Sequence, residues 1–258
     1  MKICLLSGLP RSGSTVLRSI LEQNETLNVT PYSGLREILI TNISGWNVIP
    51  HQAYPRIKAK QRVLKAIINS YHGYDKDIHI DIDRYWPRNI HLFEKLTNTK
   101  AKIVCLVRPM NDVITSLEKL KQYNPEQSLH NEYKDDTVDE RMHLYLNGFA
   151  GGAYRSLVDA LDSNVGDRLL FVDYDKLCKD PETQLKRIYN HWDLEQFNHT
   201  YSNLSLQTKE NDEYHGFTKL HNIRHDISKV EVNSKDIIGY RLTTHLKETY
   251  PSFWDKYI

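Results

Sequence analysis

The chain has 258 residues, of which 40% are hydrophobic and 26% are charged, an ordinary balance for a globular protein. Its formal net charge is only +1, so no overall electrostatic field favours nucleic acid or an anionic membrane as a partner. No apolar run approaches the roughly 20 residues of a membrane-spanning helix. At this length the chain could form one large or two small domains. Because it has no internal repeat and no low-complexity linker, we predict one domain over residues 1–258, without a membrane span.

The cysteines indicate a reducing compartment. Cys4, Cys105 and Cys178 are scattered, and the first two lie in apolar runs of strand character. An odd number without ligand spacing is typical of reduced core thiols rather than of a disulfide framework or a zinc site. Because Met1 and Lys2 lead directly into the first predicted strand, we also expect no signal peptide. The protein is therefore expected to be cytoplasmic and to need no metal.

The first predicted elements are an apolar strand over residues 3–6, a turn rich in glycine, proline and serine, and an apolar helix that begins at Thr15. This order presents backbone N–H groups and the positive end of a helix dipole to an anion. Gly8 and Gly13 would allow a ligand to approach the backbone closely, and the nearby hydroxyl groups would add donors. The stretch predicts a phosphate-binding loop.

The spacing Gly8-x-x-x-x-Gly13 is that of a nucleotide-binding P-loop. However, Ser14 stands where ATP- and GTP-hydrolysing proteins have the lysine that reaches the β- and γ-phosphates. Arg11 supplies the positive charge inside the loop instead. The sequence therefore argues against a triphosphate as the ligand.

The run Leu-Pro-Arg-Ser-Gly-Ser-Thr over residues 9–15, followed by an apolar helix, resembles the 5′-phosphosulfate loop of sulfotransferases. These enzymes use 3′-phosphoadenosine 5′-phosphosulfate (PAPS), and the likeness is greatest to the bacterial and tyrosylprotein types. In those families the loop surrounds the 5′-phosphate and the sulfuryl group. The resemblance implies that Arg11 stabilises the leaving phosphate and that the donor is bound by Pro10, Arg11, Ser12, Gly13, Ser14 and Thr15.

The next predicted elements are a short strand over residues 27–30 that Pro31 ends and a helix from Leu35 to about Ile43. A helix over residues 56–71 follows, with its apolar side chains on one face and its basic side chains elsewhere. We interpret the basic residues as a solvated helix face.

A third strand is predicted over residues 78–82, where apolar and polar residues alternate. Asp83 and Arg84 follow directly, at the carboxyl end of the strand, where open α/β sheets bind their ligands. A helix from about Asn89 to Leu96 leads to the continuous apolar run over residues 102–107. Such a run is typical of a strand that is buried on both faces of a parallel sheet.

Arg108 and Ser116 follow this fourth strand, at its end and two turns along the next predicted helix, which Asn111 or Asp112 could cap. The pair resembles the second sulfotransferase signature, an arginine and a serine eight residues apart that hold the 3′-phosphate of PAPS. A surface salt bridge between Arg108 and Asp112 is the alternative interpretation.

The second half begins with a polar stretch, residues 122–136, that we expect to be a loop or lid. A long helix over residues 138–161, bent by its glycines, precedes a fifth strand over residues 168–174. The passage from Tyr174 to the Asp-Pro-Glu that opens the next helix resembles one in sulfotransferases. That likeness places Tyr174 near the nucleotide; a buried core tyrosine is the equal alternative.

Residues 195–233 are mostly polar and irregular, and a closing helix is predicted over residues 236–250. Within the irregular part, residues 220–229 resemble a Leu-His-x-x-Arg-x-x-Ile-x-Lys stretch of the bacterial relatives. There the stretch packs over the nucleotide and supplies basic contacts. The resemblance implies that Arg224 and Lys229 contact the donor.

These elements predict an α/β fold with three layers, in which a central and mostly parallel sheet of about five strands is flanked by helices, as in P-loop proteins. The resemblance implies a sulfotransferase that moves a sulfuryl group from PAPS to a hydroxyl or amine by in-line displacement, with PAP as product. Because the donor carries single phosphates, no magnesium site is required. The acceptor is a small molecule or a peptide tyrosine, and a homodimer is one assembly that the sequence leaves open.

The general base departs from the families that the chain resembles. The histidine of the cytosolic enzymes would fall near Trp86, and the glutamate of the tyrosylprotein enzymes near Tyr32 or Ser33. The remaining candidates are Glu37, which we prefer because its helix borders the acceptor side in the relatives, and Asp83. Asp83 could instead pair with Arg84, and either residue could be a surface carboxylate. Arg84 stands about where the cytosolic enzymes have a second catalytic lysine, so we expect it to contribute charge.

Two other functions compete with this interpretation. One is a kinase-like phosphotransferase with an altered P-loop, which would require magnesium-dependent ATP binding. The other is a non-catalytic protein that binds PAP or another phosphoanion without transferring a group.

Overall fold

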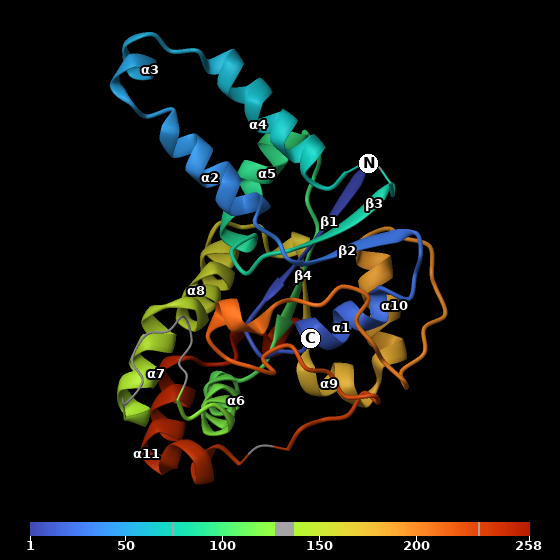
Figure 1. The fold of residues 1–258 in the computed structure, drawn as a ribbon, viewed down its shortest axis with the longest axis vertical. Helices are drawn as coiled ribbons and strands as arrows, with labels where there is room; N and C mark the ends of the chain where they lie inside the picture. Colours follow the sequence, from blue (N-terminus) through green and yellow to red (C-terminus); the bar gives the residue numbers. More distant parts are fainter. Residues whose placement is uncertain (74, 127–136, 232) are drawn as a thin grey trace.

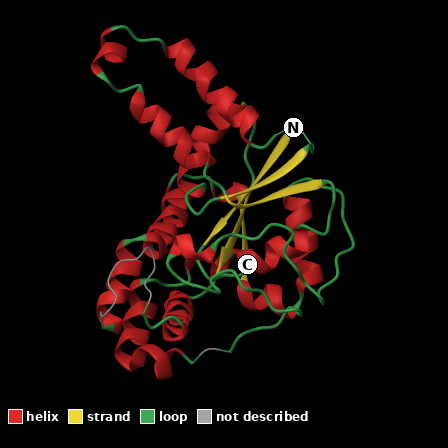
Figure 2. Ribbon diagram, viewed as in Figure 1, coloured by secondary structure: helices red, strands yellow, loops and turns green. Residues whose placement is uncertain are grey.

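A sheet of five parallel strands forms the centre of the computed structural model, which describes residues 1–73, 75–126, 137–231 and 233–258 (Figures 1 and 2). Neighbouring strands follow the order β2-β3-β1-β4-β5, and every pair is parallel. The strands are β1 (Lys2–Gly8), β2 (Leu27–Tyr32), β3 (Ile78–Ile82), β4 (Ile103–Val107) and β5 (Leu169–Asp173).

Helices connect the strands and cover both faces of the sheet (Figure 2). The longer helices in the first half are α1 (Ser14–Leu21), α2 (Leu35–Gly45), α4 (Ile57–Tyr71), α5 (Ile90–Thr97) and α6 (Met110–Tyr123). Those in the second half are α7 (Val138–Asn147), α8 (Phe149–Asp162), α10 (Pro181–His191) and α11 (Ser234–Thr249). The short helices and turns are α3 (Ile49–Ala53), α9 (Tyr174–Lys179), η1 (Pro87–Asn89), η3 (Gly166–Arg168), η4 (Asp212–His215) and η5 (Phe253–Tyr257).

Two hydrophobic clusters lie on opposite faces of the sheet. Successive residues of a strand point to opposite faces, so Cys105 belongs to one cluster and its neighbours Val104 and Leu106 to the other. The first cluster joins the sheet to α5, α6, α8 and α11, and the second joins it to α1, α9 and α10. Figure 1 shows these helix groups on the two sides of the sheet. The prediction of a three-layer α/β fold is confirmed.

Helices α2, α3 and α4 extend beyond the sheet (Figure 1, upper left). Leu35 and Leu39 of α2 and Leu64 and Ile68 of α4 are buried where the two helices meet the rest of the protein. On the far part of α4, Val63 and most of the basic side chains are exposed. The interpretation of the basic residues as a solvated face is therefore consistent with the structure.

Three local predictions are wrong. Strand β2 continues through Pro31 to Tyr32, with an irregular register after Val29. The helix predicted over residues 138–161 is divided into α7 and α8 at Gly148, whose φ of −89° and ψ of −131° are not helical. Helix α6 begins after Pro109 without a side-chain cap, so neither of the predicted capping residues serves that role.

Of the polar stretch predicted to be a loop or lid, residues 122 and 123 belong to the end of α6, and residues 127–136 lie outside the described residues. Among the residues that the structure does describe, no helix has both the length and the apolar character needed to cross a membrane.

Candidate functional site

Three strands that are neighbours in the sheet deliver the candidate residues to one edge. Strand β1 lies between β3 and β4, and all three run in the same direction. Their carboxyl ends are therefore together, which brings the loop after Gly8 beside Asp83 on one side and beside Arg108 on the other. This is the edge at which open α/β sheets bind ligands.

Glycine is required at both ends of the loop formed by residues 8–15, which we call the phosphate loop. Gly8 has a φ of 131°, and a Cβ there would lie 2.0 Å from the carbonyl oxygen of Leu106 in β4. The N–H of Leu9 donates to that same oxygen at 2.9 Å. Gly13 has a φ of 95° and immediately precedes α1. The backbone can therefore turn into the helix while remaining attached to β4.

The polar side chains of the phosphate loop have different roles. Ser12 is fully buried, and its hydroxyl lies close to the carbonyl oxygens of Leu9 and Leu106. The Ser12 side chain therefore holds the loop together. If Ser12 contacts the predicted PAPS, it would have to do so through its backbone. Ser14 and Thr15, the first two residues of α1, instead line a cavity. The first N–H groups of a helix have no partner inside it, so this end can bind an anion.

Arg11 and Arg108 meet beside the loop. The Nε of Arg11 donates to the Ser116 hydroxyl at 3.2 Å, and its Nη1 donates to the Leu220 carbonyl at 2.6 Å. The Nη1 of Arg108 donates to the carbonyl of Arg11 at 3.3 Å, and its guanidinium lies 4.5 Å from the centre of the Tyr174 ring. The structure thus brings four of the predicted donor-binding residues together.

The positive charges of Arg11 and Arg108 are not balanced by nearby carboxylates. Arg108 is 4% exposed, and within the described residues its Nε has no hydrogen-bond partner. The nearest carboxylate, that of Asp112, lies 3.9 Å from this atom. Burial lowers the pKa of Arg11, and the charge of Arg108 lowers it further. Two adjacent cations with an unpartnered buried N–H form a site for an anion.

Tyr174 contacts both the phosphate loop, at Gly13, and Arg108. Its ring packs against Gly13, where an added Cβ would lie 3.0 Å from the tyrosine Cδ2. The residue is 7% exposed, and burial raises its pKa. The side chain is therefore buried and contacts predicted nucleotide-binding residues, and its place near the nucleotide stays a prediction.

Arg224 and Lys229 point to other partners. The Nη1 of Arg224 donates to the hydroxyl of Ser228 at 3.1 Å, and the ammonium of Lys229 lies 2.6 Å from the carboxylate of Asp175. Both side chains are exposed. The geometry lends no support to their predicted contact with the donor, which stays a prediction.

Asp83 and Arg84 face the cavity from the end of β3. Oδ1 of Asp83 accepts from Nε of Arg36 at 2.8 Å and from the N–H of Tyr85 at 2.7 Å. Oδ2 has no hydrogen-bond partner among the described residues, and burial raises the pKa of this carboxyl. The Arg84 guanidinium lies 5.6 Å from the centre of the Tyr32 ring.

Of the other expected positions for a base, Tyr32 lines the cavity, whereas Glu37 and Trp86 do not. The side chain of Glu37 is 65% exposed and is bound to Arg36. Trp86, where the cytosolic enzymes would have their histidine, is fully buried and donates from Nε1 to Asp81 at 2.6 Å. Of the two predicted carboxylates, Asp83 is the one that lines the cavity.

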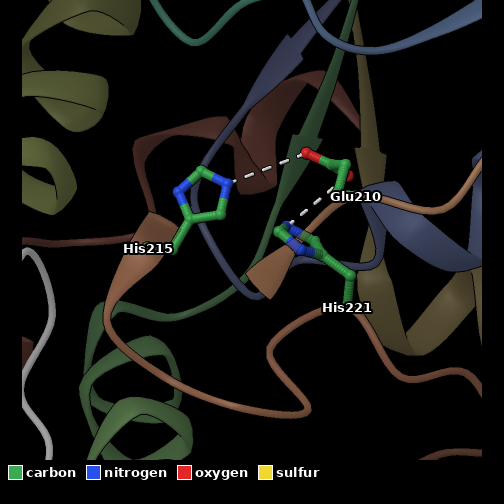
Figure 3. A group of neighbouring side chains, drawn as sticks. All are labelled: Glu210, His215 and His221. Atoms are coloured by element: carbon green, nitrogen blue, oxygen red, sulfur yellow. Dashed lines mark ion pairs between the residues drawn. The ribbon is translucent and has the colours of Figure 1, made fainter. Parts of the chain in front are cut away.

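Glu210, His215 and His221, to which the sequence patterns assign no role, lie together beside these residues (Figure 3). Glu210 and His221 both line the cavity, and His215 lies beside them. Oε2 of Glu210 lies 2.8 Å from Nη1 of Arg18 on α1 and 3.8 Å from Nε2 of His221. Glu210 and His215 come from an irregular stretch without periodicity, where polar residues are frequent. His221 is the histidine of the stretch over residues 220–229, of which only Arg224 and Lys229 are predicted to contact the donor.

Comparisons with known proteins concern the family and the fold of the chain. A family model described as "Sulfotransferase domain" matches residues 2–257. Comparison with curated proteins gave no match.

Among solved structures, sulfotransferase STF9 from Mycobacterium avium is 11% identical with a TM-score of 0.53, covering 99% of this chain and 76% of that one. The sulfotransferase domain from the curacin biosynthetic pathway is 15% identical with a TM-score of 0.51, covering 96% of each chain. A sulfotransferase from Alicyclobacillus acidocaldarius is 11% identical with a TM-score of 0.50, covering 83% of this chain and 88% of that one. At these identities the likeness concerns the fold.

Proposed function

Since this chain belongs to the sulfotransferase domain family, we propose that it transfers a sulfuryl group from PAPS to a hydroxyl or amine of an acceptor. The phosphate loop would hold the 5′-phosphate and the sulfuryl group, and Arg108 with Ser116 would hold the 3′-phosphate. Bound PAPS supplies the activated sulfuryl group. The residues of the chain bind it, orient it and stabilise the charge that develops on the leaving phosphate.

The observation that carries the proposal is the uncompensated charge around Arg108. This guanidinium is buried, and within the described part of the chain its Nε lacks a hydrogen-bond partner. Arg11 connects Ser116 to Arg108, because its side chain donates to the Ser116 hydroxyl and its carbonyl accepts from Arg108. A phosphate accepts several hydrogen bonds and carries negative charge, so it would satisfy both needs at once. The residues present therefore fit the 3′-phosphate of PAPS.

Arg11 is the residue that we place at the leaving phosphate. It lies in the loop between the helix end and Arg108, and its guanidinium is held by Ser116 and by the carbonyl of Leu220. A cation fixed in this way stabilises charge where it develops without having to reorient during the reaction. In this proposal two guanidinium groups, rather than a metal ion, carry the positive charge opposite the phosphates.

Asp83 and Arg84 would form the acceptor side. Both line the cavity together with Ser14 and Thr15, so a group in the cavity can reach the sulfuryl position from there. The unpartnered Oδ2 of Asp83 can accept a hydrogen bond from the acceptor and orient it. The predicted role of Glu37 as the base gains no support, because that side chain points to solvent.

Isothermal titration calorimetry with PAP tests the donor site. Hydrogen bonds to charged groups contribute about 1.5–3 kcal/mol each, so we expect Arg108→Ala to weaken PAP binding roughly 10- to 150-fold. Arg88→Ala is the matched control, because its partly exposed guanidinium pairs only with Asp159 among the described residues and should leave PAP affinity unchanged. Absence of PAP binding to the unaltered protein would refute the proposal.

Two further titrations separate the competing functions. ATP with magnesium should bind more weakly than PAP, because Ser14 replaces the P-loop lysine. Tighter binding of ATP would favour a kinase-like phosphotransferase. PAP binding without sulfate release from PAPS, to water or to added phenols, would favour a non-catalytic phosphoanion-binding protein.

A further inference from the structure

The stretch of residues 207–221, which we call the cover segment, is fastened to the phosphate loop and to the helix that follows it. Nη1 of Arg18 lies 2.8 Å from Glu210, and Nη2 of Arg18 donates to the carbonyl of Thr208 at 2.6 Å. At the other end of the segment, Nη1 of Arg11 donates to the carbonyl of Leu220 at 2.6 Å. His221 therefore follows a residue whose backbone is bound by the proposed catalytic arginine.

The orientation of the His221 ring is fixed by a carboxylate. Its Nδ1 lies 2.6 Å from Oδ1 of Asp212, and its backbone N–H donates to Oδ2 of the same residue at 3.2 Å. A carboxylate can only accept, so Nδ1 carries the hydrogen and Nε2 keeps its lone pair when the ring is neutral. Nε2 lies 3.8 Å from Oε2 of Glu210 (Figure 3), which is beyond hydrogen-bond distance, so this carboxylate does not occupy the Nε2 lone pair.

The cavity that His221 lines is the one that holds the proposed acceptor side. Its wall includes Ser14 and Thr15 at the helix end and Asp83 and Arg84 across from them. A histidine that lines the cavity and is oriented by an aspartate has the arrangement that acts as a general base in many enzymes.

We propose that His221 is the general base of the transfer and that Asp212 is its positioning residue, which rests on the function proposed above. The acceptor O–H proton moves to Nε2 of His221 while the acceptor oxygen forms a bond to sulfur. The bond between sulfur and the 5′-phosphate oxygen breaks, and its electron pair leaves with that oxygen to give PAP. The imidazolium then returns its proton to water.

The charged groups around His221 favour this role. Asp212 faces Nδ1, and Glu210 faces Nε2 but is engaged by Arg18. The ring of His215 lies 5.4 Å from that of His221, edge to face. Across the cavity, the carboxylate of Asp83 is committed on one oxygen to Arg36. Of these groups, His221 is the imidazole whose Nδ1 is held by a carboxylate, which leaves Nε2 as the proton-accepting atom of the ring.

The test compares His221→Gln with His225→Gln, an exposed histidine on the same stretch that serves as the matched control. Sulfate release from PAPS is followed with water and with 2-naphthol as acceptor, from pH 5 to pH 8, where imidazoles titrate. General bases contribute about 100-fold or more, so the His221 variant should be slower by that factor and should lose the rise of rate with pH. PAP affinity should be unchanged in both variants.

Asp212→Asn and a spectroscopic measurement test the positioning role. Loss of an orienting carboxylate typically lowers activity roughly 10- to 100-fold, and PAP affinity should again be unchanged. Independently of activity, proton NMR should show a strongly downfield N–H resonance in the unaltered protein that is missing in His221→Gln and displaced in Asp212→Asn.

The outcomes distinguish this inference from the proposed function. If the unaltered protein does not bind PAP, the proposed sulfotransferase function is refuted. PAP binding with sulfate release that His221→Gln leaves unchanged, or that only Asp83→Asn abolishes, would overturn the role of His221. Because Glu210, His215 and His221 place ligand atoms within 4.8 Å of one another, activity that EDTA removes and zinc restores would also overturn it. PAP binding without any sulfate release would do the same.

Discussion

Asp83 is a carboxylate with two unlike oxygens. Oδ1 accepts from Arg36 and from a backbone N–H, whereas Oδ2 has no partner among the described residues and the side chain is fully buried. Burial disfavours the charged form more than these donors favour it, so the pKa of Asp83 is raised. The residue thus carries a cost in stability at the place where it faces the acceptor cavity.

The effect of the raised pKa on stability can be measured as a pH dependence of the free energy of unfolding. A carboxyl whose pKa is raised by folding binds its proton more tightly in the folded state, so stability falls as pH rises from the ordinary aspartate value, about 3.9, through the raised value. Asparagine cannot ionise and lacks this fall. In urea unfolding from pH 4 to pH 7, the free energy of unfolding of Asp83→Asn minus that of the unaltered protein should therefore increase with pH. A difference that stays constant would contradict the raised pKa.

Single residues also show what sequence patterns can reveal. The spacing of Gly8 and Gly13 was sufficient to predict the loop, because both backbone conformations depend on the absence of a side chain. The Arg108 and Ser116 pair was predictable because a strand followed by a helix places both at one edge. By contrast, the buried hydroxyl of Ser12 donates to the carbonyls of Leu9 and Leu106. The orientation of the His221 ring depends on a contact with Asp212 within a loop. No local spacing indicates such contacts.

At the level of elements, the cover segment has little regular structure, so side-chain contacts must hold it. Arg18 is 2% exposed and binds Glu210 and the carbonyl of Thr208 in this segment. Its Nε also lies 3.3 Å from the carboxylate of Glu22 on its own helix. The backbone N–H of Gln207 donates to Glu22 at 2.8 Å. Glu22 is 6% exposed, so little water reaches this junction, and this burial raises the pKa of Glu22.

Arg18→Met should therefore release the cover segment. Removing one partner of a buried ion pair leaves uncompensated charge, so we expect a loss of about 3 kcal/mol in the free energy of unfolding. Hydrogen exchange should quicken at residues 207–215 more than in β4. The matched control is Lys186→Met, which removes an exposed pair with Glu182 on α10 and should change neither quantity measurably. Equal acceleration throughout the protein would contradict a local role.

Regular elements were predictable for a physical reason that the cover segment lacks. Helices such as α4 and α10 and the buried strand β4 carry apolar residues at fixed periods, and the structure confirms them near their expected limits. The division between α7 and α8 was not predicted. Glycine at position 148 permits either a bend or a break, and only packing against the rest of the protein selects between them.

At the level of the molecule, one sheet separates two hydrophobic clusters. Trp254 belongs to one cluster and Trp192 to the other, and both are almost entirely buried. Because adjacent residues of β4 enter different clusters, neither cluster can lose its packing without disturbing the strand that serves both. We therefore propose that the chain unfolds as one domain.

Urea unfolding of two tryptophan variants checks this proposal. Trp254→Ala and Trp192→Ala should each lower the free energy of unfolding by about 3–5 kcal/mol, and each should shift the same single transition. Tyr240→Ala, which alters a side chain that is 69% exposed, is the control and should leave the midpoint unchanged. Two separate transitions, each sensitive to one tryptophan, would show that the clusters unfold independently.

The close contact between Gly8 and the Leu106 carbonyl has a consequence for selectivity. It fixes the phosphate loop against the strand that carries Arg108, and adjacent strands lie about 4.8 Å apart. The separation between the two proposed phosphate positions is thus set by backbone hydrogen bonds, which cannot lengthen or shorten to suit a ligand. The protein should accordingly distinguish regioisomers, accepting a 3′,5′-bisphosphate and rejecting its 2′,5′ counterpart, because the backbone fixes how far Arg108 lies from the phosphate loop.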